Sequence, residues 1–180
     1  GKGVPASLFM AITRSLFRTL SQHVLSPAKI VTEMNNSISD NNESNMFVTL
    51  IVGILDLETG ILKLCNAGHN PPILIYPDGQ VSYLEFKTQI FVGVVEDFKY
   101  SDEEVVLEKE SKLFLYTDGV TEAENINKEL YGEEKLLGML SDNASSDVRT
   151  TVNVVVDSIA SHVKEAEASD DLTILLIQYE

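Results

Sequence analysis

The spacing of apolar residues changes near Met46, and this change restricts the folds open to the chain more than any other feature. Before it, apolar residues recur every four positions, which predicts an amphipathic helix over residues 5–23. Ser26 followed by Pro27 is typical of an N-cap and a first-turn proline. We therefore expect a second helix of about three turns to begin there.

Beyond Met46, runs of β-branched and aliphatic residues favour strands. Two turn sequences, Glu58-Thr59-Gly60 and Tyr76-Pro77-Asp78-Gly79, separate pairs of these runs and predict antiparallel hairpins in a meander. The runs at 47–55 and 172–177 are apolar on both faces, which suggests central strands covered by another layer. The other expected elements are strands at 105–107 and 113–116 and helices at 133–140 and 148–163.

Helices first, then clustered strands, then helices and a last strand predict an α+β fold instead of regular βαβ alternation. No linker, repeat or low-complexity tract divides the sequence, so we expect residues 1–180 to form a single domain.

The chain carries 28 acidic and 13 basic side chains, and its net charge of −15 argues against a protein that coats nucleic acid. No apolar run suits a membrane span, and no signal peptide is visible. The only cysteine, Cys65, excludes internal disulfides and is expected in the core. These features together predict a cytoplasmic protein.

Two segments place aspartates directly beside apolar strands, at Asp118-Gly119 and at Asp170-Asp171. Each alone is typical of a turn or loop. If the two strand ends lay side by side, their carboxylates would repel unless a hard cation such as Mg²⁺ or Mn²⁺ were bound there. The pair therefore suggests a metal site, on the condition that the two strands are neighbours, which the sequence leaves open.

A third segment, Asn66-Ala67-Gly68-His69 followed by Asn70-Pro71-Pro72, predicts a tight, rigid loop. His69 could be a general acid, a metal ligand or a side chain that hydrogen-bonds the loop, and without a partner the structural role is favoured. His23 and His162 fall in expected helices, at the surface or its boundary.

Taken in order, these motifs resemble the sporulation stage II E-like family, the bacterial members of the metal-dependent (type 2C) serine/threonine phosphatase superfamily. The resemblance spans the whole chain. It is carried by Gly1-Lys2-Gly3-Val4-Pro5-Ala6-Ser7-Leu8, Asn66-Ala67-Gly68-His69-Asn70-Pro71-Pro72, Tyr116-Thr117-Asp118-Gly119-Val120-Thr121-Glu122-Ala123, Leu130-Tyr131-Gly132 and Asp170-Asp171-Leu172-Thr173.

The resemblance implies a four-layer α-β-β-α sandwich of antiparallel sheets flanked by helices, with a site for two Mn²⁺ or Mg²⁺ ions at one end. It implies that Asp118 and Asp170 are metal ligands and hence catalytic. Asp171 and Gly119 would support them, while Asn66 and His69 would shape a loop near the site without binding metal.

The implied reaction is hydrolysis of phosphoserine or phosphothreonine by a water activated between two cations. By resemblance, the substrate is a phosphorylated anti-sigma-factor antagonist, a small protein of bacterial partner-switching pathways in stress or sporulation.

One departure from the family matters. Its members usually carry Asp-Val-Ser just before Gly-Lys-Gly and a Gly-Asp strand earlier, which supply a metal-bridging aspartate, whereas this chain begins at Gly1. We therefore expect a phosphatase domain truncated at its N-terminus that binds metal weakly and turns over little substrate. We also expect a sensory or receiver domain upstream, and a sheet edge that could pair with a second copy in a homodimer.

The sequence is also compared with two other functions by what each would require. A domain without the bridging aspartate could be a catalytically silent module that binds a regulatory partner, and the residues upstream of Gly1 would discriminate. A calcium-binding structural domain is disfavoured, because no Asp-rich loop with a central glycine and a terminal glutamate is present.

Overall fold

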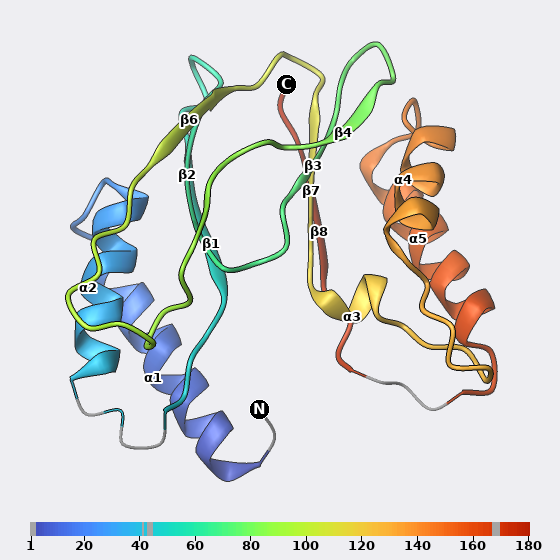
Figure 1. Ribbon diagram of the computed structural model, residues 1–180. Helices are drawn as coiled ribbons and strands as arrows, with labels where there is room; N and C mark the ends of the chain where they lie inside the picture. The colour runs from blue at the N-terminus through green and yellow to red at the C-terminus, as the bar shows by residue number, and fades with distance from the viewer. Residues whose placement is uncertain (1–2, 41, 43–44, 167–169) are drawn as a thin grey trace. The chain divides into compact units, whose positions relative to one another are not determined.

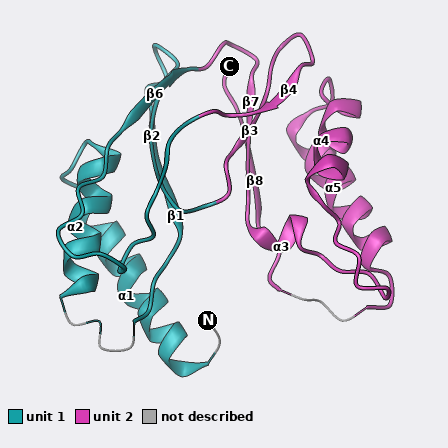
Figure 2. Ribbon diagram, viewed as in Figure 1, with its two compact units in different colours: residues 1–69, 86–106 teal, residues 70–85, 107–180 magenta. Residues whose placement is uncertain are grey.

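The structure is a computed structural model, and it describes residues 3–40, 42, 45–166 and 170–180. The chain forms two compact units (Figure 2). The first consists of residues 1–69 and 86–106, and the second of residues 70–85 and 107–180. Each unit has its own sheet, helices and apolar core.

The first unit opens with two helices, α1 (Val4–Leu20) and α2 (Pro27–Ser39) (Figure 1). Both were predicted, although α1 ends before the expected position because residues 21–23 form a turn. Ser26 is the N-cap of α2, and its hydroxyl accepts a hydrogen bond from the backbone N–H of Lys29 at 3.2 Å. This bond satisfies one of the N–H groups that a helix start leaves without a partner.

The sheet of the first unit is built around β2 (Ile61–Ala67). Antiparallel partners are β1 (Leu50–Leu55), across the predicted Glu58-Thr59-Gly60 turn, and β6 (Glu103–Val106). The short strand β5 (Thr88–Gln89) pairs with the end of β2 in parallel, which the sequence pattern did not indicate.

Helix α2 supplies half of the buried residues in the core cluster of the first unit. Ile30, Val31 and Met34 are fully buried and cluster with Cys65 of β2, which lies in the core as predicted. The buried amide of Asn35 also faces this core. It donates to the carbonyl of Val95 at 2.8 Å and accepts from a loop N–H, so its polar atoms are satisfied.

The second unit contains a four-stranded antiparallel sheet in the order β4-β3-β7-β8. These strands are β3 (Ile73–Ile75), β4 (Val81–Tyr83), β7 (Lys112–Tyr116) and β8 (Ile174–Gln178). The helices of this unit are α3 (Asp118–Thr121), α4 (Glu133–Asp142) and α5 (Val148–Val163). As Figure 1 shows, α4 and α5 lie along one face of this sheet, where Phe114, Leu136 and Val155 are fully buried.

The α+β class is confirmed, but two details of the expected sheets are wrong. The strands do not form one meander, because β2 and β3 belong to different sheets. Between them, Gly68 has φ +76° and Pro71-Pro72 has no N–H groups, so the ladder cannot continue.

The second wrong expectation is that residues 47–55 and 172–177 form central strands. Among the described strands, β1 pairs with β2 alone and β8 with β7 alone, and Leu175 of β8 is 53% exposed. A continuous apolar run indicates that both faces of a strand tend to be buried. It does not indicate whether the strand has one or two hydrogen-bonded neighbour strands in its sheet. The single domain and the four-layer order remain predictions.

No helix within the described ranges is both long and apolar enough to cross a membrane.

Candidate metal-binding site

The ends of β7 and β8 lie side by side in the second unit. The two strands pair antiparallel, with Tyr116 opposite Ile174, so the end of β7 meets the start of β8. Beyond that pair, the N–H of Thr117 donates to the carbonyl of Thr173 at 3.1 Å, and the N–H of Thr173 donates to Oγ1 of Thr117 at 3.1 Å. The condition that the sequence left open, that the two strands are neighbours, is therefore met.

Asp118 begins the short helix α3 directly after β7, where a turn had been the simplest interpretation of Asp-Gly. Its side chain is exposed, and Oδ1 accepts the N–H of Gly119 at 3.0 Å. Its backbone carbonyl accepts the N–H of Glu122 at 2.8 Å. One oxygen of the carboxylate is thus held by a backbone N–H at the start of α3.

Gly119 brings α3 into direct contact with the segment before β8. A Cβ atom at this position would lie 2.4 Å from the carbonyl oxygen of Asp171 and 3.1 Å from its carbonyl carbon. No positive φ is involved, so the glycine is required by close approach of two backbone segments and not by a special turn conformation.

Asp170 and Asp171 occupy the opposite side of this contact, and both are exposed. Oδ1 of Asp170 accepts the N–H of Asp171 at 2.9 Å, and the carbonyl of Asp171 accepts the hydroxyl of Thr117 at 3.4 Å. The carboxylates of Asp118, Asp170 and Asp171 therefore belong to two segments in backbone contact. In the described part of the chain no lysine or arginine forms an ion pair with any of them.

The side chains of Asp118, Asp170 and Asp171 offer only carboxylate oxygens, which is the type of ligand that hard cations such as Mg²⁺ and Mn²⁺ prefer. Mg²⁺ usually keeps several waters and takes only one or two carboxylates from the protein, together with substrate phosphates. Over the described ranges no three His, Cys, Asp or Glu side chains are gathered closely enough to hold an ion by themselves. The assignment of Asp118 and Asp170 as metal ligands therefore remains a prediction, in which water or phosphate oxygens would complete the site.

Asn66 and His69 lie together in the first unit and form a locked loop. The Asn66 side chain is buried; Oδ1 accepts the N–H of His69 at 2.7 Å, and Nδ2 donates to the His69 carbonyl at 2.9 Å. Nδ1 of His69 also lies 3.2 Å from Oγ1 of Thr49. The place of this loop beside the aspartates remains a prediction, because the aspartates belong to the other unit.

Thr117 and the buried Tyr116 belong to a motif noted in the sequence, but no role is assigned to either of them from the sequence pattern. Thr117 bridges the two strand ends through one hydroxyl that both donates and accepts. Burial raises the pKa of Tyr116 above its ordinary value of 10.0. The only sequence signal for Thr117 is its position between an apolar strand and Asp118, a candidate metal ligand.

The Gly1-Lys2 portion of the first motif lies outside the described residues.

Residues 1–180 match the family model described as Stage II sporulation protein E (SpoIIE). Protein IcfG of Synechocystis is 25% identical over 203 residues, which cover 98% of this chain and 32% of that protein. Phosphoserine phosphatase RsbU of Bacillus subtilis is 25% identical over 179 residues, which cover 99% of this chain and 52% of that protein. The chain therefore spans about a third to a half of the length of these relatives.

Solved structures share the fold. The SiaA-PP2C domain of Pseudomonas aeruginosa gives a TM-score of 0.86 at 22% identity, covering 100% of this chain and 72% of that chain. RsbX in complex with magnesium gives a TM-score of 0.70 at 19% identity, covering 100% of this chain and 77% of that chain. These likenesses show an α+β fold of the PP2C kind, with two sheets and helices. Because the family model matches the whole chain, the chain belongs to the stage II sporulation protein E family of PP2C-type serine/threonine phosphatase domains.

Proposed function

We propose that the chain is the catalytic domain of a metal-dependent phosphatase that hydrolyses phosphoserine or phosphothreonine on a protein. The observation that carries this proposal is the meeting of two aspartate-bearing strand ends, with Asp118 on one and Asp170 and Asp171 on the other. Membership of the family and the likeness to phosphoserine phosphatase RsbU support the reaction class.

In this proposal, Asp118 and Asp170 are the metal ligands and Mg²⁺ or Mn²⁺ is the cofactor. The magnesium complex of RsbX, which shares the fold, supports the choice of a hard divalent cation. When bound, such ions activate a water and neutralise charge on the phosphoryl group. They also offset the repulsion between a chain with a net charge of −15 and a phosphorylated substrate.

The other residues of the site orient these carboxylates. The hydrogen bond from the N–H of Asp171 fixes one oxygen of Asp170 and leaves the second oxygen available to a ligand. The N–H of Gly119 does the same for Asp118. Thr117 and the close approach at Gly119 hold the two segments together, so that both carboxylates are positioned before a ligand arrives.

We further propose that the substrate is a small phosphorylated regulatory protein of the anti-sigma-factor antagonist type. The support is the family and the relative RsbU, in which the matching region is 52% of the protein. The wider roles in sigma-factor regulation and stress signalling belong to this same proposal.

The test uses the natural-length protein with one substrate protein prepared in phosphoseryl, phosphothreonyl and phosphotyrosyl forms. Phosphate release is expected from the first two forms with Mn²⁺ or Mg²⁺, and none in excess chelator. Equal release in chelator, or release from the phosphotyrosyl form alone, would overturn the proposal. Partner binding without release in any metal would instead support a silent binding module.

A further inference from the structure

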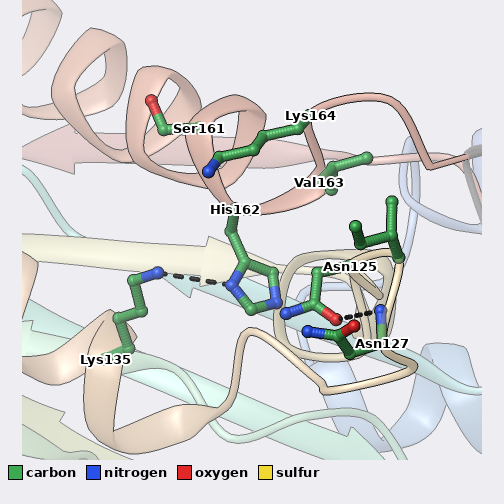
Figure 3. A pocket seen from close by; sticks show the side chains of 8 residues that line it. Asn125, Asn127, Lys135, Ser161, His162, Val163 and Lys164 are labelled. Atoms are coloured by element: carbon green, nitrogen blue, oxygen red, sulfur yellow. Dashed lines mark hydrogen bonds between the residues drawn. The ribbon is translucent and has the colours of Figure 1, made fainter.

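A polar hollow of about 260 Å³ lies in the second unit, and it includes none of the proposed metal ligands. One wall is the end of α5, with His162 and the following Lys164, and another is Lys135 of α4. The loop between α3 and α4, which carries Asn125 and Asn127, closes it (Figure 3). Side chains from three separate elements therefore converge on one small volume.

The charge of this hollow is opposite to that of the chain. The whole sequence has a net charge of −15, yet Lys135 and Lys164 both line this one site. Neither lysine has an ion pair with a carboxylate among the described residues. Two lysines that line the same hollow give it a local positive charge, which an anion bound there would neutralise.

The carboxylates on the loop are engaged with other partners. Glu124 forms an ion pair with Lys128 at 2.8 Å, and Oε2 of Glu129 accepts from Nδ2 of Asn125 at 2.7 Å. Glu124 is thereby paired with a cation, whereas Glu129 keeps its negative charge beside Asn125 at the edge of the hollow.

Both ring nitrogens of His162 have a hydrogen-bond partner in this setting. Its Nε2 lies 2.9 Å from the carbonyl oxygen of Glu129, which can only accept, so Nε2 carries the hydrogen. Its Nδ1 lies 3.4 Å from Nζ of Lys135, which can only donate, so Nδ1 is the acceptor. His162 in this tautomer tethers Lys135, as the dashed line in Figure 3 marks.

Lys135 is also held by an aromatic ring. Its Nζ lies 4.7 Å from the centroid of the Tyr131 ring, and that ring meets His162 edge-on at 5.6 Å between centroids. The Tyr131 hydroxyl in turn donates to Oγ of Ser158 at 2.9 Å. The ammonium group is thus positioned before binding, while N–H groups not used by His162 remain available to an anion.

We propose that this hollow binds a phosphoryl group, with Lys135 and Lys164 as its two cationic contacts and Asn127 and Ser161 as neutral polar neighbours. Two lysines match the charge of a phosphate dianion better than that of a single carboxylate. The identity of the phosphoryl group rests on the proposed function: it is either a phosphorylated side chain of the substrate protein or the phosphate released from it.

The first experiment needs no catalysis and uses inorganic phosphate as the probe. Phosphate is titrated into the metal-free, natural-length protein in the presence of chelator, and the amide and His162 ring signals are followed by NMR. We expect saturable shifts at residues 125–127 and 162–164. The double variant Lys135→Gln/Lys164→Gln should bind at least about tenfold more weakly, because a hydrogen bond to a charged group is lost at each position.

Two controls make this result specific. Lys109→Gln removes an exposed lysine elsewhere in the second unit and should leave phosphate binding unchanged. Lys135→Arg/Lys164→Arg keeps both charges and should retain binding. Absence of shifts around the hollow, or equal affinity in the wild type and the double glutamine variant, would overturn the proposal.

The second experiment distinguishes the two sources of phosphate. With Mn²⁺ and a phosphoseryl protein, a hollow that holds a substrate phosphoryl group predicts about a tenfold higher KM in the double glutamine variant with unchanged kcat. A hollow that holds released phosphate predicts unchanged KM and weaker inhibition by added phosphate. A wild-type protein that released no phosphate would contradict the proposed function, while the titration in chelator would still decide the binding site.

Discussion

Gly119 is the single residue on which the contact between the two aspartate segments depends most. Its missing Cβ would sit 2.4 Å from a backbone oxygen, which cannot move aside as the end of a side chain can. We predict that Gly119→Ala lowers the free energy of unfolding by about 1–3 kcal/mol, as overpacking does elsewhere. Denaturant unfolding of the purified variant measures this loss.

The matched control is Gly138 in the middle of α4, where an added Cβ meets nothing within 4 Å. Gly138→Ala should raise the free energy of unfolding by about 0.5–1 kcal/mol, because alanine suits a helix better than glycine. If both variants changed stability alike, the close approach at Gly119 would not be the cause.

Asp118 and Asp170 are expected to matter for activity and not for folding. Asp118→Asn and Asp170→Asn keep the shape of an exposed side chain but remove a negative oxygen from the cation. We predict that turnover falls by at least about 100-fold, since groups that merely orient ligands already contribute ~10–100-fold. The free energy of unfolding should change by less than about 0.5 kcal/mol.

Asp157→Asn, an exposed aspartate on α5, is the control and should keep full turnover. Near-normal turnover of the Asp118 and Asp170 variants at limiting metal would show that other groups hold the ion.

These residues differ in how far the sequence predicts them. Asp118 and Asp170 stand out locally, because a carboxylate directly beside an apolar strand is conspicuous. The roles of Thr117 and Gly119 depend on a contact with Asp171 across the β7–β8 pair. Such long-range contacts leave no periodic signal in either segment, so a local pattern cannot reveal them.

At the scale of elements, α5 has a cap that titrates. Asp147 is its N-cap and accepts from the hydroxyl and the N–H of Thr150, at 2.6 and 3.0 Å. The side-chain bond from Thr150, followed by the backbone bonds, lowers the pKa of Asp147 below its ordinary value of 3.8. Its stabilising effect is therefore complete above pH 3.8 and is lost as the pH falls through the lower, folded-state pKa.

Asp147→Asn isolates this effect, because asparagine caps a helix but does not titrate. We predict that the stability advantage of the wild type over Asp147→Asn is constant near neutral pH and declines below pH 3.8. Urea unfolding of both proteins across that range measures the difference. A difference that stayed constant with pH would contradict the assigned cap.

The sequence predicts most accurately those elements whose periodicity, caps or turn residues all lie within one short segment. The bounds of α5 match the expected 148–163, and both hairpins form at the predicted turns. The two-residue strand β5 is too short to show any period in the sequence. The apolar runs that contain β1 and β8 predict central strands, and this prediction is wrong. Strand order depends on which segments pair over long sequence distances, and hydrophobicity alone does not specify it.

At the scale of the whole molecule, Cys65 reports on the integrity of the first unit. It is 1% exposed in that unit's core, and burial raises the pKa of its thiol to about 12. Since the thiolate is the reactive form, we predict that thiol reagents label the native protein far more slowly than the denatured protein at mildly alkaline pH. The labelling rate should rise with urea as the first unit opens. Equal labelling rates with and without denaturant would show that this core is not closed.

The direct test of the central claim is a Mn²⁺ titration in which bound metal and phosphate release are measured on the same natural-length protein and phosphoseryl substrate. The account predicts no release in chelator and a rise in release that follows metal binding, with both curves displaced to higher Mn²⁺ in Asp118→Asn and unmoved in Asp157→Asn. Full release in chelator, or wild-type curves for Asp118→Asn, would contradict the claim that the carboxylates at these strand ends hold the catalytic cation.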